Sequence, residues 1–354
     1  MSYDLAGLGW DEARAAELAE LEATTERQLT PGRVARVDRG AITVLASHGQ
    51  LRSRPSGRLF HTTATEGTVA NPTVGDWVAL DGPVVVAVLP RRTAFERGVA
   101  GGASLAQVVA ANIDTVFIVC PLVGRPRPRL VQRCLALAWQ SGAAPVVLLT
   151  KSDLCPDAET RLDQARTQII GVPIHAVSAT TGDGLNALNP YLSAGHTVAM
   201  IGPSGAGKST LANALGDGRF DLATGAIRDD GKGRHTTTAR ELVLLPSGAV
   251  AIDTPGLRSL PLWEADDGIA AVFADIDDLA RDCRFSDCRH NGEPGCAVGQ
   301  AIDVGDLTAG RLADYGKLQR EQRWLETRRD ARARAQEHAR SKAFFKRVRD
   351  QPHR

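Results

Sequence analysis

Long apolar runs are missing from this chain of 354 residues. No stretch has the roughly 18 uninterrupted apolar residues that a membrane-spanning helix needs, and the N-terminus lacks the apolar core of a signal peptide. We therefore expect a cytoplasmic protein that has no membrane partner. Its hydrophobic content of 43% and charged content of 23% are ordinary for a globular chain. Its length predicts two or three domains.

Cysteine is scarce as well, and its positions are uneven. Three of the six cysteines are scattered, whereas the other three cluster with a histidine near the C-terminus. The cluster has the spacing C-x4-C-x-H-x5-C and consists of Cys283, Cys288, His290 and Cys296. In a reducing compartment such a cluster indicates a metal rather than disulfides, and three thiolates with one imidazole complete a closed, structural zinc site. The alternative is three ordinary cysteines beside a surface histidine.

Net charge is nearly absent, at +1, but it is unevenly distributed. Residues 311–354 contain 14 Lys and Arg against 6 Asp and Glu, a net charge of +8 that leaves −7 for residues 1–310. A helix or helix pair is expected over residues 312–347, with Leu318, Trp324 and Leu325 as docking residues. Such a basic region indicates a polyanionic partner such as RNA, although a solvated basic face would look the same.

The motif around which the chain is organised is Gly-Pro-Ser-Gly-Ala-Gly-Lys-Ser at residues 202–209, which fits the phosphate-loop pattern G-x-x-x-x-G-K-[ST]. A predicted strand at 197–201 precedes it and a predicted helix at 210–215 follows it. In this context backbone N–H groups surround phosphate oxygens, Lys208 reaches the terminal phosphates, and Ser209 ligates Mg²⁺. The expected nucleotide contacts in this loop are Gly202, Pro203, Ser204, Gly205, Ala206, Gly207, Lys208, Ser209 and Thr210. A glycine-rich turn that binds nothing is the alternative.

Two further strand ends predict how the base is recognised. A predicted strand at 144–149 is followed by Thr150-Lys151-Ser152-Asp153, and one at 174–177 by Ser178-Ala179. The Asp153 carboxylate can accept from both N1–H and the 2-amino group of guanine, a donor pair that adenine lacks. Lys151 would lie along the base, and backbone N–H groups at 178–179 would contact the base carbonyl. The expected ligand is therefore GTP or GDP.

Two segments after the phosphate loop are candidates for sensing the third phosphate. Residues 224–239 are glycine-rich and lack apolar periodicity, and one of their threonines, taken as Thr237, would complete the Mg²⁺ coordination. A predicted hairpin then ends in Asp253-Thr254-Pro255-Gly256. Asp253 would hold the Mg²⁺ shell and the Gly256 N–H would sense the phosphate, although these residues also suit a plain turn. Base recognition thus precedes phosphate binding, which precedes the switches, and this order is a circular permutation of the usual GTPase.

The rest of the chain shows two other patterns. Short β-runs with turn residues between them fill residues 32–90 and predict a small OB-like barrel. Arg52, Arg54 and Arg58 share one polar stretch there, which would contact a nucleic-acid backbone or form a solvated loop. Residues 10–27 predict either a short helix outside the main fold or a solvated extension, and residues 91–102 predict a linker.

The predicted fold is multi-domain. It combines an N-terminal all-β OB-like barrel, a central α/β phosphate-loop GTPase domain in circularly permuted order, and a C-terminal, mostly α-helical zinc-binding domain. The expected boundaries are an N-terminal extension at 1–30, the RNA-binding barrel at 31–94, the GTPase domain at 95–262, and the zinc domain with its basic helix at 263–354.

This combination resembles the ribosome small-subunit-dependent GTPase A family of bacterial ribosome-biogenesis factors. The resemblance covers about residues 30–345 and is carried by the motif order, Gly-Arg-His-Thr-Thr-Thr at 233–238, Asp253-Thr-Pro-Gly256 and the Cys/His spacing. It implies a monomer with one structural Zn²⁺ and with Mg²⁺ accompanying GTP. It also implies slow intrinsic GTP hydrolysis that the 30S subunit stimulates, binding to 16S rRNA, and a role late in 30S maturation.

Two residues depart from the usual GTPase pattern. Leu257 stands where Ras-like proteins carry the water-orienting glutamine, and an apolar side chain cannot position water. By resemblance, His235 is the catalytic candidate beside Lys208, although a loop histidine without a catalytic role stays open. Thr150 replaces the usual asparagine of the base motif, which changes base affinity modestly while Asp153 maintains guanine selectivity.

Two rival functions also stay open. An ATP-dependent kinase or ATPase shares the phosphate loop but needs no Asp153. An RNA-binding module would use its nucleotide site to regulate affinity, without significant turnover.

Overall fold

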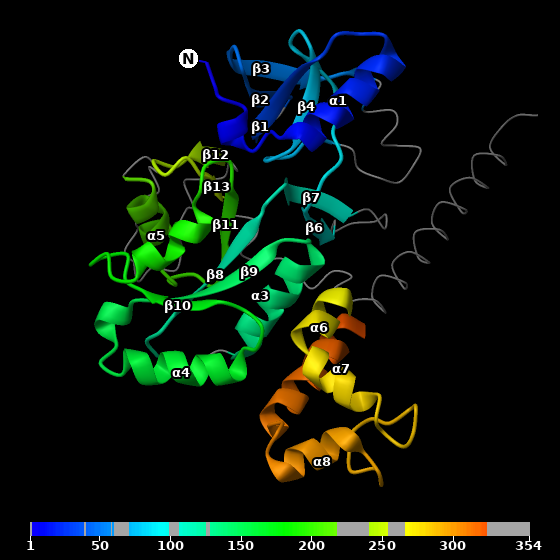
Figure 1. Cartoon of the computed structure of the whole chain (residues 1–354), viewed down its shortest axis with the longest axis vertical. Coiled ribbons are helices and arrows are strands. Elements are labelled where there is room, and N and C mark those ends of the chain that lie inside the picture. The colour runs from blue at the N-terminus through cyan, green and yellow to red at the C-terminus, as the bar shows by residue number, and fades with distance from the viewer. Residues whose placement is uncertain are drawn as a thin grey trace, which may run out of the picture. The chain divides into compact units, whose positions relative to one another are not determined.

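A computed structural model of the chain describes residues 2–38, 40–57, 59, 71–98, 106–124, 128–217, 241–253 and 266–323 (Figure 1). The chain divides into two compact units. The first comprises Met1–Glu96 and Val108–Leu260, and the second comprises Arg97–Gln107 and Pro261–Arg354. Of the helices within the described ranges, none has both the length and the apolar character needed to cross a membrane.

A mainly parallel sheet carries the predicted nucleotide motifs. Its strands are, in spatial order, β10 (Ile174–Val177), β9 (Ala144–Thr150), β8 (Thr115–Pro121), β11 (Thr197–Ile201), β13 (Val250–Asp253) and β12 (Glu241–Leu244). Neighbours are parallel except in the β12–β13 hairpin. Their near-continuous apolar runs suit strands that are covered on both faces. The flanking helices of this region are α3 (Pro128–Gln140), α4 (Ala158–Gln168) and α5 (Lys208–Leu215), with 3-10 turns η2 (Ser152–Leu154) and η3 (Leu185–Tyr191) between elements.

A five-stranded barrel occupies the N-terminal part of the first unit. It is formed by β1 (Thr30–Asp38), β2 (Ala41–Ala46), β3 (Gly49–Pro55), β4 (Trp77–Asp81) and β5 (Val84–Val88). The barrel closes because β1 pairs with both β2 and β4, while β3 pairs with β5. Its apolar core contains Val34, Ile42, Val44, Val78, Leu80 and Val85. The predicted β-barrel region is confirmed.

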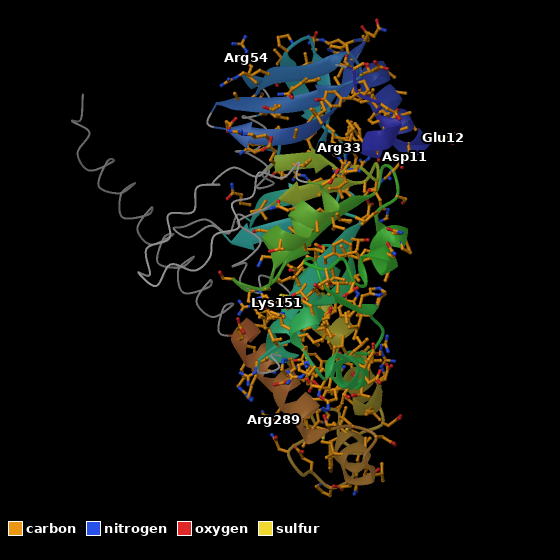
Figure 2. All side chains as sticks on the ribbon, turned by 90° about the vertical axis from the view of Figure 1, so that its left-hand side faces the viewer. Asp11, Glu12, Arg33, Arg54, Lys151 and Arg289 are labelled. Atoms are coloured by element: carbon orange, nitrogen blue, oxygen red, sulfur yellow. The ribbon has the colours of Figure 1, made fainter. Side chains whose placement is uncertain are left out.

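The polar stretch within the barrel is a strand and not a solvated loop. Arg52 and Arg54 belong to β3, where both side chains are exposed while Ser53 between them is buried. The exposed and buried side chains alternate with the period of two that a strand requires. A hydrophobic pattern does not reveal this alternation, because the residues involved are polar or charged. Figure 2 shows Arg54 on the barrel strands, and Arg58 lies outside the described residues.

The N-terminal segment forms a helix, as predicted, but its expected place outside the main fold is wrong. The segment contains η1 (Ala6–Leu8) and α1 (Glu12–Thr25), and Asp11 caps α1 by accepting from the backbone N–H of Arg14. Leu18 packs with Leu29 and with Ala79 of the barrel, and Leu8 is buried as well. A few apolar residues among many polar ones are therefore enough to fix the helix on the barrel.

The predicted linker is also partly wrong, because β6 (Ala94–Gly98) pairs with β7 (Ala106–Ala111) in a two-stranded sheet. Phe95, which is buried, gives this strand an apolar anchor within an arginine-rich stretch. The remainder of the predicted linker, residues 99–102, lies outside the described residues.

The barrel and the parallel sheet are joined by backbone hydrogen bonds. Strand β12, at the edge of the nucleotide sheet, pairs antiparallel with β1 of the barrel, with Arg36 opposite Glu241. The two sheets therefore form one sheet of 11 strands. The hairpin between the two predicted switch segments is in this way tied to the barrel as well as to the chain that follows it.

The second unit is mostly helical where the structure describes it. It contains two short helices, α6 (Asp266–Val272) and α7 (Ala274–Ala280). These are followed by α8 (Ala297–Val304) and by helical residues 309–323. Arg311 donates to both carboxylate oxygens of Asp275 at 2.6 and 2.7 Å. Leu318 is 2% exposed, which agrees with its predicted docking role, whereas Trp324 and Leu325 lie outside the described residues.

Candidate nucleotide site and Cys/His cluster

The predicted nucleotide motifs meet at one edge of the parallel sheet. Strands β10, β9, β8, β11 and β13 all run in the same direction, so their carboxyl ends lie along this edge. Thr150 at the end of β9 is opposite both Val177 of β10 and Pro121 of β8. Each predicted nucleotide motif therefore lies at the carboxyl end of one of these strands. The 178–179 turn follows β10, the base motif follows β9, the phosphate loop follows β11, and Asp253 ends β13. This is the edge at which open α/β sheets bind ligands.

The phosphate loop needs its glycines for two different reasons. Gly202 has φ of 140°, and a Cβ there would collide with the carbonyl oxygen of Val119 on β8. Gly207 has φ of 92° and caps the N-terminus of α5. Between them Ala206 is completely buried in the core that also contains Leu211 of α5. The loop is thus fixed to the sheet at its middle, while its glycines leave backbone N–H groups free of side-chain crowding.

The phosphate-loop lysine is held inside the loop. Lys208 is buried, and its Nζ donates to the carbonyl oxygens of Gly202 at 2.8 Å and Pro203 at 2.5 Å. Ser209 and Thr210 occupy the first turn of α5, whose N–H groups have no acceptor within the helix. The ammonium group and the positive end of this helix together favour an anion at this loop.

The base motif has a direct hydrogen bond to the phosphate loop. Thr150 is buried, and its hydroxyl lies 2.5 Å from the carbonyl oxygen of Ala206 and 3.2 Å from that of Cys120. Because a hydroxyl has one proton, it donates to one of these oxygens at a time. From the sequence we predicted only that Thr150 replaces the usual asparagine of the base motif. Its role as a bridge depends on a residue 56 positions away and had no local signal.

The chain leaves the extended conformation of β9 directly after Thr150. Lys151 has φ of 62°, in the left-handed region, and precedes the 3-10 turn Ser152–Leu154 that contains Asp153. Asp153 is exposed, so its carboxylate is accessible at this edge. Figure 2 shows where Lys151 lies on the fold.

The second predicted base contact lies in a tightly bonded turn. Ser178 is completely buried; its backbone N–H donates to the Asp183 carbonyl at 2.8 Å, and its Oγ accepts from the Thr181 N–H at 3.2 Å. Ala179, the next residue, packs against the core of the sheet. These bonds fix the backbone at the end of β10.

Several predicted site residues cannot be placed. His235, Thr237 and Gly256, together with Leu257, lie outside the described residues. Asp253 ends β13 and its backbone pairs with Glu241. The roles expected for these residues stay predictions.

The predicted metal ligands converge in the second unit. The ligand atoms of Cys283, Cys288, His290 and Cys296 all lie within 4.8 Å of one another. The His290 Nδ1 is 3.6 Å from the Cys283 sulfur and 3.4 Å from the Cys296 sulfur, and the two sulfurs are 4.0 Å apart. In a tetrahedral zinc site, with Zn–S of about 2.3 Å and Zn–N of about 2.0 Å, neighbouring ligand atoms are roughly 3.5–3.8 Å apart. The cluster therefore fits a tetrahedral metal ion.

Backbone donors support the same cluster. The N–H of Gly299 donates to the sulfur of Cys296 at 3.2 Å, in the first turn of α8, and so favours a thiolate there. The Glu293 carboxylate accepts from the backbone N–H groups of Arg289 at 3.1 Å and Asn291 at 2.6 Å, which shapes the loop on either side of His290.

The chain is similar to proteins of one family along most of its length. A sequence model of the family described as RsgA GTPase matches residues 88–263. The small ribosomal subunit biogenesis GTPase RsgA of Streptomyces coelicolor is 47% identical over 341 residues, which cover 94% of this chain and 90% of that protein. The protein of the same name from Opitutus terrae is 46% identical, with 92% of both chains covered.

Solved structures show the same similarity. The crystal structure of YjeQ from Thermotoga maritima matches with a TM-score of 0.61 and 26% identity, covering 82% of this chain and 97% of that one. The structure of YloQ, described as a circularly permuted GTPase, matches with a TM-score of 0.61 and 25% identity, covering 83% of this chain and 95% of that one. The permuted order of motifs predicted for this chain agrees with that description.

Proposed function

This chain belongs to the RsgA family of GTPases, and from that premise we propose that it hydrolyses GTP during late maturation of the 30S ribosomal subunit, which stimulates its turnover. The observation that carries the proposal is the hydrogen bond from Thr150 to Ala206, because it joins a guanine-type base motif to a phosphate loop at one sheet edge. The names of the relatives supply the ribosomal part of the proposal.

In this proposal the nucleotide is bound by residues from three strand ends. Asp153 accepts from the guanine N1–H and 2-amino group, and Lys151 lies along the base. The base carbonyl accepts from the backbone N–H of Ala179, because the N–H of Ser178 already donates to the Asp183 carbonyl. Lys208 exchanges the loop carbonyls that it now contacts for oxygens of the terminal phosphates. The remaining phosphate contacts come from the backbone of residues 202–210.

Hydrolysis requires a water molecule that is aligned with the third phosphate. We assign this orienting role to His235, since Leu257 offers no polar group. Mg²⁺ would be held by Ser209 and Thr237, with Asp253 in its outer shell, and would neutralise charge on the phosphates. Gly256 would sense the third phosphate through its N–H.

The remaining regions are proposed to recognise RNA. The barrel, with its 1-2-3-5-4 strand order closed by β1, is proposed to be an OB fold that contacts 16S rRNA through Arg52 and Arg54. Zn²⁺ is the metal proposed for Cys283, Cys288, His290 and Cys296, where it would be structural. We retain domain boundaries at 31–94, 95–262 and 263–354, and a monomer in the cytoplasm.

The test is GTP turnover by the full chain with and without purified 30S subunits. We expect slow turnover alone and a clear increase with 30S subunits, which the His235→Ala variant loses while still binding GTP. Equal turnover in the two conditions would contradict the proposal. Tight binding with negligible turnover in both would instead favour a nucleotide-regulated RNA-binding module.

A further inference from the structure

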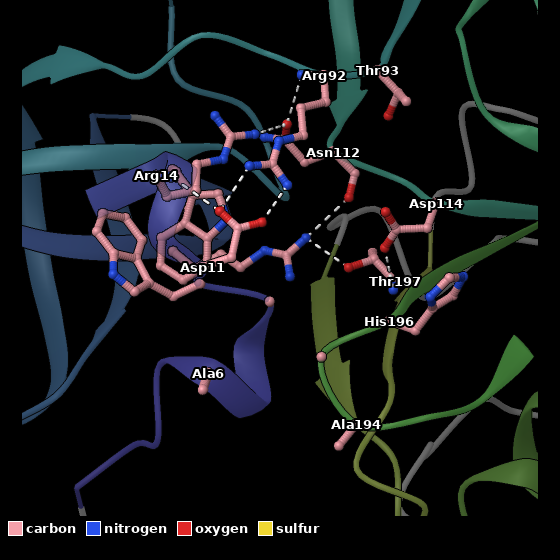
Figure 3. Close-up of a pocket in the computed structure, with 15 residues that line it drawn as sticks. Ala6, Asp11, Arg14, Arg92, Thr93, Asn112, Asp114, Ala194, His196 and Thr197 are labelled. Atoms are coloured by element: carbon pink, nitrogen blue, oxygen red, sulfur yellow. Dashed lines mark hydrogen bonds and ion pairs between the residues drawn. The ribbon is translucent and has the colours of Figure 1, made fainter. Parts of the chain in front are cut away.

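Two arginines are completely buried where the N-terminal segment, the barrel and the nucleotide sheet meet. Arg14 and Arg33 are each 1% exposed. They line a cavity of about 300 Å³ together with Asn112, Asp114 and Thr197 (Figure 3). Nucleotide chemistry takes place at the opposite ends of the same strands, so the proposed function leaves these buried charges without a role.

Arg33 makes hydrogen bonds to four separate segments of the first unit. Its guanidinium donates to the Leu8 carbonyl in the N-terminal segment and to the Gly75 carbonyl before β4, the latter at 3.4 Å. It also donates to the Asn112 carbonyl before β8 at 3.0 Å and to the hydroxyl of Thr197, the first residue of β11, at 2.8 Å. Figure 2 shows Arg33 at the junction of the barrel and the parallel sheet.

The charge of Arg33 is expensive to keep there. Among the described residues its hydrogen-bond acceptors are carbonyl and hydroxyl oxygens, not carboxylates. Burial lowers the pKa of Arg33 to about 10, with the charge of Asp114 acting in the opposite direction, so the guanidinium is still protonated at neutral pH. Apolar side chains fill such a space at lower cost when packing is all that is needed. What the guanidinium adds is a set of directed bonds among segments that must keep one relative position.

One of those bonds, to Thr197, leads to the nucleotide site, and so does the strand in which Arg33 lies. Thr197 begins the strand that ends at Ile201, directly before Gly202 of the phosphate loop. Its backbone N–H is fixed by the Asp114 carboxylate at 2.7 Å. Arg33 itself lies in β1, which pairs with β12 at Arg36, three residues further on. The barrel strand β1 therefore holds the nucleotide sheet at two places, through β11 and through the hairpin β12–β13.

We propose that Arg33 is a positioning residue that couples nucleotide binding at the phosphate loop to the barrel through the Thr197 hydroxyl. A nucleotide that stabilises β11 also stabilises the docking of β1, and by linkage a docked barrel favours nucleotide binding. Because nucleotide binding belongs to the proposed function, this coupling rests on it, but it requires no ribosome.

The test is hydrogen exchange of the β1 amides, residues 30–38, followed by mass spectrometry on the full chain with and without GDP or a non-hydrolysable GTP analogue. Thr197→Val removes the hydroxyl and keeps the shape of the side chain, and Thr197→Ser keeps the hydroxyl as the matched control. Arg36→Met is a second control, because Arg36 is a partly exposed arginine on the same strand. Nucleotide affinity is measured in parallel by calorimetry.

We expect nucleotide to slow exchange in β1 of the wild type and of both controls by at least about fivefold, the lower end of measured couplings, and by less than about twofold in Thr197→Val. A purely structural contact would speed exchange in Thr197→Val equally with and without nucleotide, and that result would overturn the proposal. So would a wild type that binds nucleotide without any slowing in β1. A wild type that binds no guanine nucleotide would refute the proposed function itself, and the coupling with it.

Discussion

The nucleotide edge and the Cys/His cluster hold their functional residues in opposite ways. At the edge of the parallel sheet that carries the nucleotide motifs, called the nucleotide edge here, Ala206 and Leu211 are completely buried in a large apolar core. The hydroxyl of Thr150 joins the base motif to the phosphate loop. In the cluster, Cys283 and Cys288 are only half-buried, and Phe285 between them is exposed. Loop 281–296 has hydrogen bonds to shape it but little apolar surface to bury.

The difference shows how each site is stabilised. The phosphate loop is organised by the sheet beneath it, so its geometry exists before a ligand arrives. We expect the cluster to depend on a bound metal ion, because four ligands around one ion would replace the missing core and metal binding would then be part of folding. Loss of the metal should disrupt the second unit and spare the nucleotide edge.

The largest expected effect comes from Cys288→Ser. Structural zinc in zinc-finger peptides binds with an apparent free energy of about 10–16 kcal/mol, so losing one thiolate should release the ion and unfold the cluster. Metal analysis and proteolysis are expected to show loss of zinc and cleavage near residues 281–296, with GTP affinity unchanged. Cys155→Ser, a buried cysteine of the first unit, is the matched control and should retain its zinc. A Cys288→Ser variant with full zinc would refute the ligand assignment.

The next largest effect is a change of nucleotide preference in Asp153→Asn. The amide cannot accept from both guanine donors, whereas it can pair with the carbonyl that xanthine carries instead of the 2-amino group. We expect GTP affinity to fall by roughly 10⁴-fold, as in other sites that lose a designed hydrogen-bond partner, with xanthosine triphosphate now preferred. Competition binding measures it. An unchanged nucleotide preference would contradict the guanine assignment and would favour the alternative of an ATP-dependent enzyme.

A smaller effect is expected at Thr150. Thr150→Val removes the bond to Ala206 and leaves that carbonyl unpaired in the core, at a cost of about 1–3 kcal/mol. Both GTP affinity and the unfolding temperature should fall. Thr150→Asn offers two donors, enough for Ala206 and Cys120 together, and should bind GTP at least as well as the wild type. If Thr150→Val binds GTP normally, the bridge does not organise the nucleotide edge.

The smallest effect concerns Asp11, at the start of α1. Hydrogen bonds from Arg92 at 2.6 and 2.8 Å, and then from the Arg14 N–H, hold the pKa of Asp11 well below its ordinary 3.8. The pKa is lower in the folded than in the unfolded chain, so this stabilisation is present above about pH 4 and is lost as the pH falls further.

Asp11 and Arg92 are 47% and 45% exposed, so the pair contributes at most about 1 kcal/mol. Urea unfolding between pH 3 and 6 should show a shallower acid loss for Asp11→Asn, while Asp163→Asn, in an exposed pair with Arg166, should follow the wild type. Identical profiles for Asp11→Asn and the wild type would mean that this pair does not fasten α1 to the fold.

The sequence predicted those features whose signal is local. The phosphate loop between a strand and a helix, the strand that ends before Thr150, and the ligand spacing from Cys283 to Cys296 are all visible in short windows. Neither the bond from Thr150 to Ala206 nor the pairing of Arg36 with Glu241 has such a signal, because each joins residues far apart in the chain. Arg14 and Arg33 are the clearest case. From the sequence alone, charged side chains are expected to be exposed to solvent. These two are buried because they form hydrogen bonds to segments that only folding brings together.

The most direct test of the whole account is GTP turnover by zinc-loaded and metal-free protein, each with and without 30S subunits. If the first unit carries the chemistry and the second helps to recognise the ribosome, the metal-free protein should retain its slow basal turnover and lose the stimulation by 30S subunits. Stimulation that survives complete removal of the metal, or basal turnover that disappears with it, would contradict this division of roles.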